Sequence, residues 1–344
     1  MTNSVASPVL QTVPLGPRWP MLDPFLFCAH HDDAYPAGNE HLAPAVPLGD
    51  RDMGQDFSGL DGFSMYHGQE VPGFPNHPHR GFETVTFVRK GIIDHADSLG
   101  AAARFGRGDV QWLTAGGGIV HSEMFPLLES DSPNPLELFQ IWLNLPASDK
   151  MVDPYFTMFW DEDIPRVEAI DPDGRTTVVT VIAGKLGSIP PHDPPPNSWA
   201  SRSEADLAIW HIDLEPGATW ELPAAEGGDD TLRVLYVFEG DTVRVADVEV
   251  ANDHGVQLAG GSSVQLRAGE ARVEALLLQG KPLNEPVAQY GPFVMNTQAE
   301  IQQAFSDYQA TGFGGWPWSS PDPDHGPDRG RFARHVDGRV EERD

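Results

Sequence analysis

The 344-residue sequence has a single cysteine, Cys28, and this scarcity excludes several kinds of site. One thiol cannot form a disulfide within the chain, and it cannot build the multi-cysteine sites that hold structural zinc or iron–sulfur clusters. Cys28 lies in the apolar stretch FLFCAHHDD, and no activating partner is evident around it. We therefore expect a buried, structural cysteine.

Basic residues and long apolar runs are also scarce. The chain has 22 Lys and Arg against 51 Asp and Glu, a formal net charge of −29. Such a surface repels phosphate backbones and anionic membranes, so we expect no direct nucleic-acid partner and no membrane partner. No stretch approaches the ~20 apolar residues of a membrane helix, and the first residues lack the features of a secretory signal. The expected location is the cytoplasm.

What the chain does contain is typical of a globular, all-β protein. Apolar residues make up 40% of it, and its length suits about two domains. Short runs such as TVTFV, VQWLT and RVLYVFEG lie between frequent glycines and prolines, a pattern typical of β-sandwiches and barrels. One segment, Thr297–Gln309, predicts a helix, with Thr297 and Glu300 forming a capping box at its start.

A proline-rich stretch, SIPPHDPPPNSWASRSE, separates two β-rich halves. Proline lacks the amide donor that a sheet needs, so this stretch predicts a linker or a long covering loop. The expected parts are an N-terminal segment over 1–50, a first domain over 51–185, a linker over 186–204, a second domain with the helix over 205–312, and a mobile tail over 313–344.

The two halves look like a weak repeat, because HRGFETVTFVRKG can be aligned with GDDTLRVLYVFEG. When Gly240 is set opposite Gly91, His77 and His79 fall opposite Glu226 and Gly228. The second half has lost this histidine pair, so a site built on the pair would lie in the first half.

The segment PNHPHRGFET carries a His-x-His pair followed by a glutamate. Side chains alternate faces along a strand, so an unkinked strand would place all the odd-numbered residues here on one face. Apolar members of that set indicate a face turned inward, although a proline and an Arg–Gly pair could interrupt the register. The set is His77, His79, Glu83, Val85 and Phe87.

A second segment, GGGIVHSEM, shows the same alternation of a histidine and a glutamate with apolar residues. Ile119, His121 and Glu123 alternate onto one face, and Gly116–Gly118 suits a tight turn or a close backbone approach just before them. Three imidazoles and one carboxylate suit a divalent first-row metal, and would leave two positions of a six-coordinate ion open. A lone His-x-His is common, so ordinary surface or core histidines remain the alternative.

At these residues the chain resembles the pirin family of the cupin superfamily. The similar stretches are HPHRGFETVTFVRKGIIDHADSLG, GDVQWLTAGGGIVHSEMFP, LFQIWLNLP and GKPLNEPVAQYGPFVMNTQAEIQQAFSDYQ. The resemblance implies a two-domain bicupin with two β-barrel or jelly-roll domains, a C-terminal helix, and metal in the first domain alone. It implies one divalent metal ion, most often Fe(II), with Mn, Ni, Cu, Co or Zn as alternatives. The implied ligands are His77, His79, His121 and Glu123.

Glu83 matches the glutamate of the general cupin motif, whereas pirins take their carboxylate ligand from His-x-Glu. We therefore expect Glu83 to orient a ligating imidazole or to line the substrate pocket, and we expect Arg80 near the same pocket. His30, His31 and His41 could line the pocket or cap the barrel, and of these alternatives we favour structural or surface roles.

The resemblance implies two functions of different classes. The first is a dioxygenase similar to the quercetin 2,3-dioxygenases, in which a flavonol reacts with O2 at the metal, Glu123 is the catalytic base, and the apolar residues Val85, Phe87 and Ile119 pack a planar aromatic substrate. The alternative is an iron-dependent redox sensor that binds and regulates a protein partner. An isomerase acting on a sugar phosphate fits poorly, because the metal motif has few basic residues near it.

Overall fold

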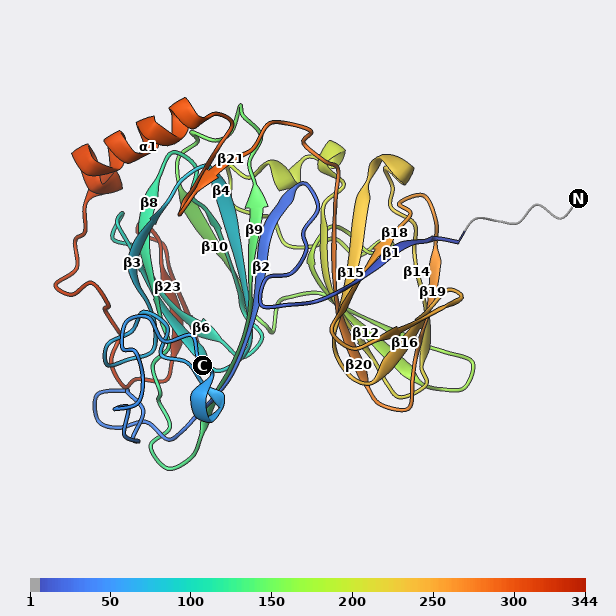
Figure 1. Cartoon of the computed structure of the whole chain (residues 1–344), viewed down its shortest axis with the longest axis horizontal. Helices are drawn as coiled ribbons and strands as arrows, with labels where there is room; N and C mark the ends of the chain where they lie inside the picture. The colour runs from blue at the N-terminus through green and yellow to red at the C-terminus, as the bar shows by residue number, and fades with distance from the viewer. Residues whose placement is uncertain (1–6) are drawn as a thin grey trace, which may run out of the picture. The chain divides into compact units, whose positions relative to one another are not determined.

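The computed structural model describes residues 7–344, which form two compact units (Figure 1). We call them the histidine-bearing unit and the second unit, and we describe each by itself. Both are built from β-strands, as the sequence predicts. The histidine-bearing unit comprises residues 29–161, 195–198 and 285–344, and the second unit comprises residues up to 28, 162–194 and 199–284.

Two sheets face each other in the histidine-bearing unit (Figure 1). The five-stranded sheet has the order β10-β7-β4-β9-β2, and the six-stranded sheet has the order β24-β23-β6-β5-β8-β3. The strands of the first sheet are β2 Phe25–Tyr35, β4 Phe82–Lys90, β7 Val110–Thr114, β9 Asn134–Asn144 and β10 Tyr155–Phe159. Those of the second are β3 Gly73–His79, β5 Ile92–Asp97, β6 Ala102–Gly106, β8 Ile119–Met124, β23 Arg331–Arg334 and β24 Val340–Arg343.

The inner faces of these two sheets share one hydrophobic core. Phe105 from β6, Leu113 from β7 and Phe156 from β10 are at most 2% exposed and belong to it. A shift of one residue along any of these strands would turn its apolar side chains away from the core. The core therefore fixes which residues of each strand face inward, and with them the inward-facing polar residues.

The helix α1, Gln298–Thr311, covers the outer face of β8. Its N-terminus has the predicted capping box: the Thr297 hydroxyl accepts from the Glu300 amide, and the Glu300 carboxylate accepts from the Thr297 amide. Ile301 of the helix packs in one cluster with Val120 of β8 and Phe293 of the short hairpin β21 (Ala288–Tyr290) and β22 (Phe293–Met295). No helix among residues 7–344 is long and apolar enough to cross a bilayer.

The second unit also has two sheets, with the orders β1-β18-β15-β20-β13-β12-β11 and β14-β19-β16-β17. In the larger sheet β15 lies between β18 and β20, just as β4 lies between β7 and β9, which agrees with the predicted repeat. Its strands are β1 Val9–Pro14, β11 Arg166–Ile170, β12 Thr176–Ala183, β13 Ala208–Leu214, β14 Thr219–Leu222, β15 Leu232–Glu239, β16 Thr242–Val245, β17 Val248–Ala251, β18 His254–Leu258, β19 Val264–Ala268 and β20 Val273–Gly280.

The division of the structure differs from the boundaries expected from the sequence. Strands β11 and β12 fall before the proline-rich stretch, but β12 pairs with β13 and both belong to the second unit. The helix and the residues after it belong to the histidine-bearing unit. Hydrophobic patterning identifies a strand but not its partner, since pairing partners far apart in sequence are chosen by tertiary packing.

The segment expected to be a mobile tail, residues 313–344, ends in an ordered hairpin. Strand β23 pairs with β6, and β24 pairs with β23. Arg331 Nη1 lies 2.6 Å from a carboxylate oxygen of Asp109, and the Trp160 indole donates to Glu341 at 2.8 Å. Ala333 is fully buried. The tail therefore contributes both core packing and a covered sheet edge.

We predict that a chain ending at Asp328, which lacks this hairpin, melts at least about 5 °C lower than the full chain, since a loss of about 2 kcal/mol produces a shift of that size. The measurement is a thermal melt followed by circular dichroism. Val336→Ser, at an exposed position of the same hairpin, is the control and should leave the melting temperature unchanged. Equal melting temperatures for the full and shortened chains would mean that the hairpin adds no stability.

Candidate metal centre

The three histidines singled out in the sequence come together on the inner face of the six-stranded sheet. Strands β3 and β8 are antiparallel neighbours, and His77 and His121 are direct cross-strand partners. The ring centroid of His121 lies 4.5 Å from that of His77 and 4.9 Å from that of His79. One ring nitrogen from each of the three lies within 4.8 Å of the others, a spacing that suits three ligands of one metal ion.

The hydrogen bonding of these imidazoles also fits a metal. The Nδ1–H of His77 can donate to the Pro75 carbonyl at 2.9 Å, which leaves the Nε2 lone pair for a ligand. Both ring nitrogens of His121 and the Nδ1 of His79 are buried, and they have no hydrogen-bond partner among residues 7–344. Buried polar atoms normally have partners, and these nitrogens are suited to coordinate a divalent metal.

Burial keeps the imidazoles neutral, which is the form that binds metal. It lowers the pKa of His77 to about 4, although the hydrogen bond to Pro75 opposes this shift. It lowers the pKa values of His79 and His121 well below the ordinary range, and the neighbouring histidines add to the effect. At neutral pH no proton needs to leave these rings before a metal binds.

Glu123 lies beside the three histidines, on the same face of β8 as His121. One of its carboxylate oxygens, Oε2, is 3.8 Å from His121 Nε2. The Gln140 amide donates to that oxygen at 3.1 Å, and the Thr86 hydroxyl donates to Oε1 at 3.3 Å. Burial raises the pKa of Glu123, against the opposing effects of His95 and these two hydrogen bonds. The carboxylate, which is carried by the six-stranded sheet, is thus held next to the imidazoles by hydrogen bonds from the five-stranded sheet.

A fourth buried histidine, His95, faces the same interior, and the sequence analysis missed it. It is the cross-strand partner of Glu123, and its ring centroid is 5.4 Å from that of His121. Its Nε2 lies 3.4 Å from a carboxylate oxygen of Asp97, whose other oxygen accepts from two backbone amides of the following turn. The strand pattern of IIDHAD could have indicated an inward histidine, but nothing in the sequence pairs β5 with β8.

Aromatic side chains enclose the histidines. The Phe82 ring lies 4.9 Å from His79, and the Trp142 ring lies 5.4 Å from it, while the two rings are 4.3 Å apart. Both come from the five-stranded sheet, from β4 and β9. Their contact with a histidine of the opposite sheet could not be predicted without the packing of one sheet on the other.

The structure corrects the expectation for Glu83. Thr86 of β4 faces inward, and Glu83, three residues away, therefore faces the opposite side of the sheet. There its carboxylate is fully buried and accepts from the Thr114 hydroxyl and, at 2.8 Å, from the Ser198 hydroxyl. Burial raises its pKa to about 7. Glu83 orients no imidazole of the site.

The physical reason is that the chain changes from one sheet to the other between His79 and Glu83. Gly81 has a φ of +86°, and the chain passes there from β3 in one sheet to β4 in the other. The two-residue count from His77 fails at this turn, so Val85 and Phe87 also face away from the histidines. A Cβ at Gly81 would lie 1.9 Å from the Val294 carbonyl oxygen, which explains the glycine.

Arg80 is not a pocket residue either. Its Nε donates to the Gly117 carbonyl at 2.7 Å, and its Nη1 lies 2.7 Å from a carboxylate oxygen of Asp307 in α1. The guanidinium carbon lies 4.5 Å from the centre of the Phe313 ring. Through these contacts Arg80 connects the end of β3 to the helix α1, on the face opposite the histidines.

His30, His41 and Cys28 have the structural or surface roles expected of them. His30 stacks on Phe139 at 4.5 Å, with Nε2 3.1 Å from Glu137, and His41 is exposed. Cys28 is fully buried, and burial raises the pKa of its thiol. The Nδ1 of His31 is 2.8 Å from the Tyr66 hydroxyl, and its ring contacts Phe74.

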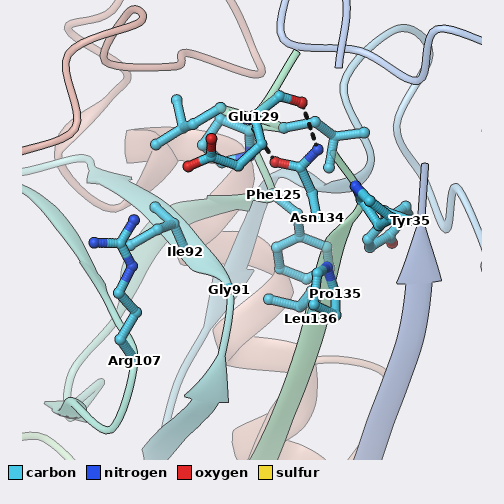
Figure 2. A pocket seen from close by; sticks show the side chains of 13 residues that line it. Tyr35, Gly91, Ile92, Arg107, Phe125, Glu129, Asn134, Pro135 and Leu136 are labelled. Atoms are coloured by element: carbon cyan, nitrogen blue, oxygen red, sulfur yellow. Dashed lines mark hydrogen bonds between the residues drawn. The ribbon is translucent and has the colours of Figure 1, made fainter. Parts of the chain in front are cut away.

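A separate pocket of about 190 Å³ lies in the histidine-bearing unit (Figure 2). Figure 2 shows Phe125, Pro135 and Leu136 forming apolar walls, with Arg107 to one side and with Asn134 hydrogen-bonded to the backbone of Glu129. None of the three metal-site histidines lines this pocket. The chemistry described above therefore depends on the histidine cluster and not on this cavity.

The fold and the site together define a bicupin, a chain of two related β domains with an inward-facing histidine cluster in one of them. Models of the pirin family and of the pirin C-terminal cupin domain match residues 7–143 and 209–314. A pirin-like protein of Caulobacter vibrioides is 41% identical over 69% of this chain and 79% of its own length. The pirin of Homo sapiens is 36% identical over 72% of this chain and 80% of its own length. This chain belongs to the pirin family.

A solved structure also supports this assignment. A quercetin 2,3-dioxygenase from Acinetobacter baumannii superposes with a TM-score of 0.68 at 26% sequence identity. The match covers 89% of this chain and 98% of that one. The similarity therefore extends across both units and is not limited to the metal motif.

Removal of one imidazole should remove the metal. We predict that His121→Gln retains less than about a tenth of the metal of the wild-type protein, because a mutation that takes away one ligand of a metal site weakens binding strongly. Glu83→Gln is the matched control, since it alters a buried carboxylate on the far face of the neighbouring sheet. Metal analysis of both proteins after dialysis is the measurement. Loss of metal in Glu83→Gln would contradict the assignment of faces.

Acid should destabilise the metal-free protein through the same histidines. The pKa of His77 is about 4 when folded and has an ordinary value of 6.5 when exposed. Between these values the unfolded chain binds more protons, so the free energy of unfolding falls as pH is lowered from about 6.5 to about 4. We predict that His77→Gln removes about 1–3 kcal/mol of this pH-dependent loss. Urea unfolding in chelator at pH 7.5 and 5 tests this, and an equal pH dependence in both proteins would contradict it.

Proposed function

We propose that this pirin-family protein is a metal-dependent dioxygenase that cleaves flavonols such as quercetin. The observation that carries the proposal is the cluster of three neutral imidazoles, one half-buried and two buried, with a hydrogen-bonded carboxylate beside it. The similarity to a quercetin 2,3-dioxygenase over both units supports the same activity. The substrates would be a planar flavonol and O2, and the products a depside and carbon monoxide.

We propose Fe(II) as the metal, held by His77, His79, His121 and Glu123. A bound divalent metal supplies Lewis acidity toward a coordinated hydroxyl and redox chemistry toward O2. Imidazole nitrogen with one carboxylate suits iron, and it also suits manganese, cobalt or nickel. The expected preference for iron can be tested by metal analysis of protein purified without added metal.

Glu123 would accept the proton of the flavonol 3-hydroxyl. Its carboxylate is fixed by Gln140 and Thr86, so that it need not reorganise when the substrate arrives. Burial raises its pKa, which makes it a stronger base than an exposed glutamate. The rings of Phe82 and Trp142 would exclude water from the reacting atoms.

We predict that Glu123→Gln lowers the turnover of quercetin by at least about a hundredfold, since general bases commonly contribute that much, and that it binds metal more weakly. The assay follows oxygen uptake and carbon monoxide release, with each rate divided by the metal content of the protein. Glu83→Gln again serves as the control and should retain turnover. Normal turnover per metal in Glu123→Gln would exclude it as the base.

The second candidate is an iron-dependent redox sensor that regulates a protein partner. The formal charge of −29 favours a basic partner protein for such a role. The discriminating experiment compares the two functions in one preparation. Quercetin turnover with carbon monoxide release supports the enzyme, whereas a partner affinity that changes between the ferrous and ferric protein, without turnover, supports the sensor.

A further inference from the structure

A long ordered loop joins β2 to β3 and carries an exposed aromatic ring, Phe57, which contacts Phe74, and Phe74 in turn contacts His77. Phe57 in this loop is 56% exposed, although it belongs to a cluster of otherwise buried or half-buried rings. The loop is the blue segment before β3 in Figure 1. Long ordered loops in compact domains commonly bind ligands, so the position of this ring needs an explanation.

The rings form a continuous run from solvent to the first metal ligand. The Phe57 ring lies 5.1 Å from His67 and 6.5 Å from Phe74, and the Phe74 ring lies 6.4 Å from His77. Exposure decreases along the same direction: His79, His121 and Glu123 are at most 5% exposed, whereas His77 and Phe74 are half-buried. Phe57 is therefore the exposed end of this run of rings.

Hydrogen bonds within the loop hold the backbone next to Phe57 in place. The backbones of Asp56 and Tyr66 bond to each other in both directions, at 2.9 and 2.7 Å. Arg51 donates to the Asp56 carboxylate at 2.8 Å and to the Phe63 carbonyl at 2.8 Å. The guanidinium also lies over the Phe63 ring, at 3.8 Å from its centre. Phe57 follows Asp56 directly, so its position is fixed by a preorganised network.

We propose that Phe57 is a specificity-determining residue, which stacks on the second aromatic ring of a planar polyphenol whose chelating ring binds at the histidines. This inference rests on the proposed function and names a substrate class for it. The substrate must extend beyond the ring that binds the metal, since a single-ring ligand at the histidines would not reach Phe57 along this run of side chains. Aromatic pairs prefer offset or edge-to-face contacts at 4.5–7 Å, and the exposed Phe57 ring is free to form one.

The test compares two probes and two proteins in the metal-loaded state without oxygen. Quercetin has the second ring, whereas 3-hydroxy-4-pyranone has only the chelating part. For Phe57→Ala we expect the Kd of quercetin to rise about five- to tenfold, because a lost aromatic contact has an effect of this size. The Kd of the pyranone should change less than about twofold. Absorbance titrations measure both.

Three further measurements separate binding from folding. Metal content and melting temperature should match the wild-type values in Phe57→Ala. Phe57→Trp restores a ring and should restore quercetin affinity, whereas Phe57→Leu restores apolar area alone and should not. Tyr290→Ala is the control for an exposed aromatic elsewhere, since Tyr290 is 66% exposed and packs on Phe305 of α1.

The outcomes are distinct. A rise in Kd for quercetin but not for the pyranone supports the inference. Unchanged quercetin affinity in Phe57→Ala, or recovery with Phe57→Leu, overturns it while leaving the dioxygenase proposal intact. A wild-type protein that binds neither probe overturns the proposed function and this inference together.

Discussion

The pairing of β3 with β8 is the interaction on which the rest of the site depends. Because this pairing sets His77 opposite His121, two short motifs more than forty residues apart present their side chains to one point in the interior. A slip of one residue in either strand would turn its histidines to the outer face, where α1 packs. The register is fixed from both sides, by the apolar core inside and by the cluster of Val120, Ile301 and Phe293 outside.

Burial gives the site its chemistry. The same exclusion of water that keeps the imidazoles neutral raises the pKa of Glu123, so one physical cause sets the protonation of both the imidazoles and the carboxylate. Hydrogen bonds from the opposite sheet then orient the carboxylate. Beside this centre Asp97 lies within 3.4 Å of His95, and the rings of Phe82 and Trp142 pack against His79.

Arg80 and Glu83 were candidates for the site in the sequence, but their contacts show structural roles. Arg80 fastens α1 to the motif strands, which keeps the outer cover of β8 in position. Glu83 holds Thr114 and Ser198 on the far side of the neighbouring sheet. For Glu83 the cause is Gly81, where the chain leaves one sheet for the other and the alternation of faces begins again. Arg80 follows the inward-facing His79 directly, so ordinary alternation turns it to the outer face.

The sequence by itself determined the fold class, the capped helix, the buried cysteine and the histidine cluster, because each depends on local patterns: alternation, capping residues and spacing within one strand. It could not show that His95 joins the cluster, that residues 331–343 form a hairpin on β6, or that residues 166–183 pair beyond the proline-rich stretch. It also could not show that Phe57 contacts Phe74, which in turn contacts His77. These features depend on which strands and loops meet, and hydrophobic patterning carries no information about partners that are distant in the chain. Tertiary packing decided them.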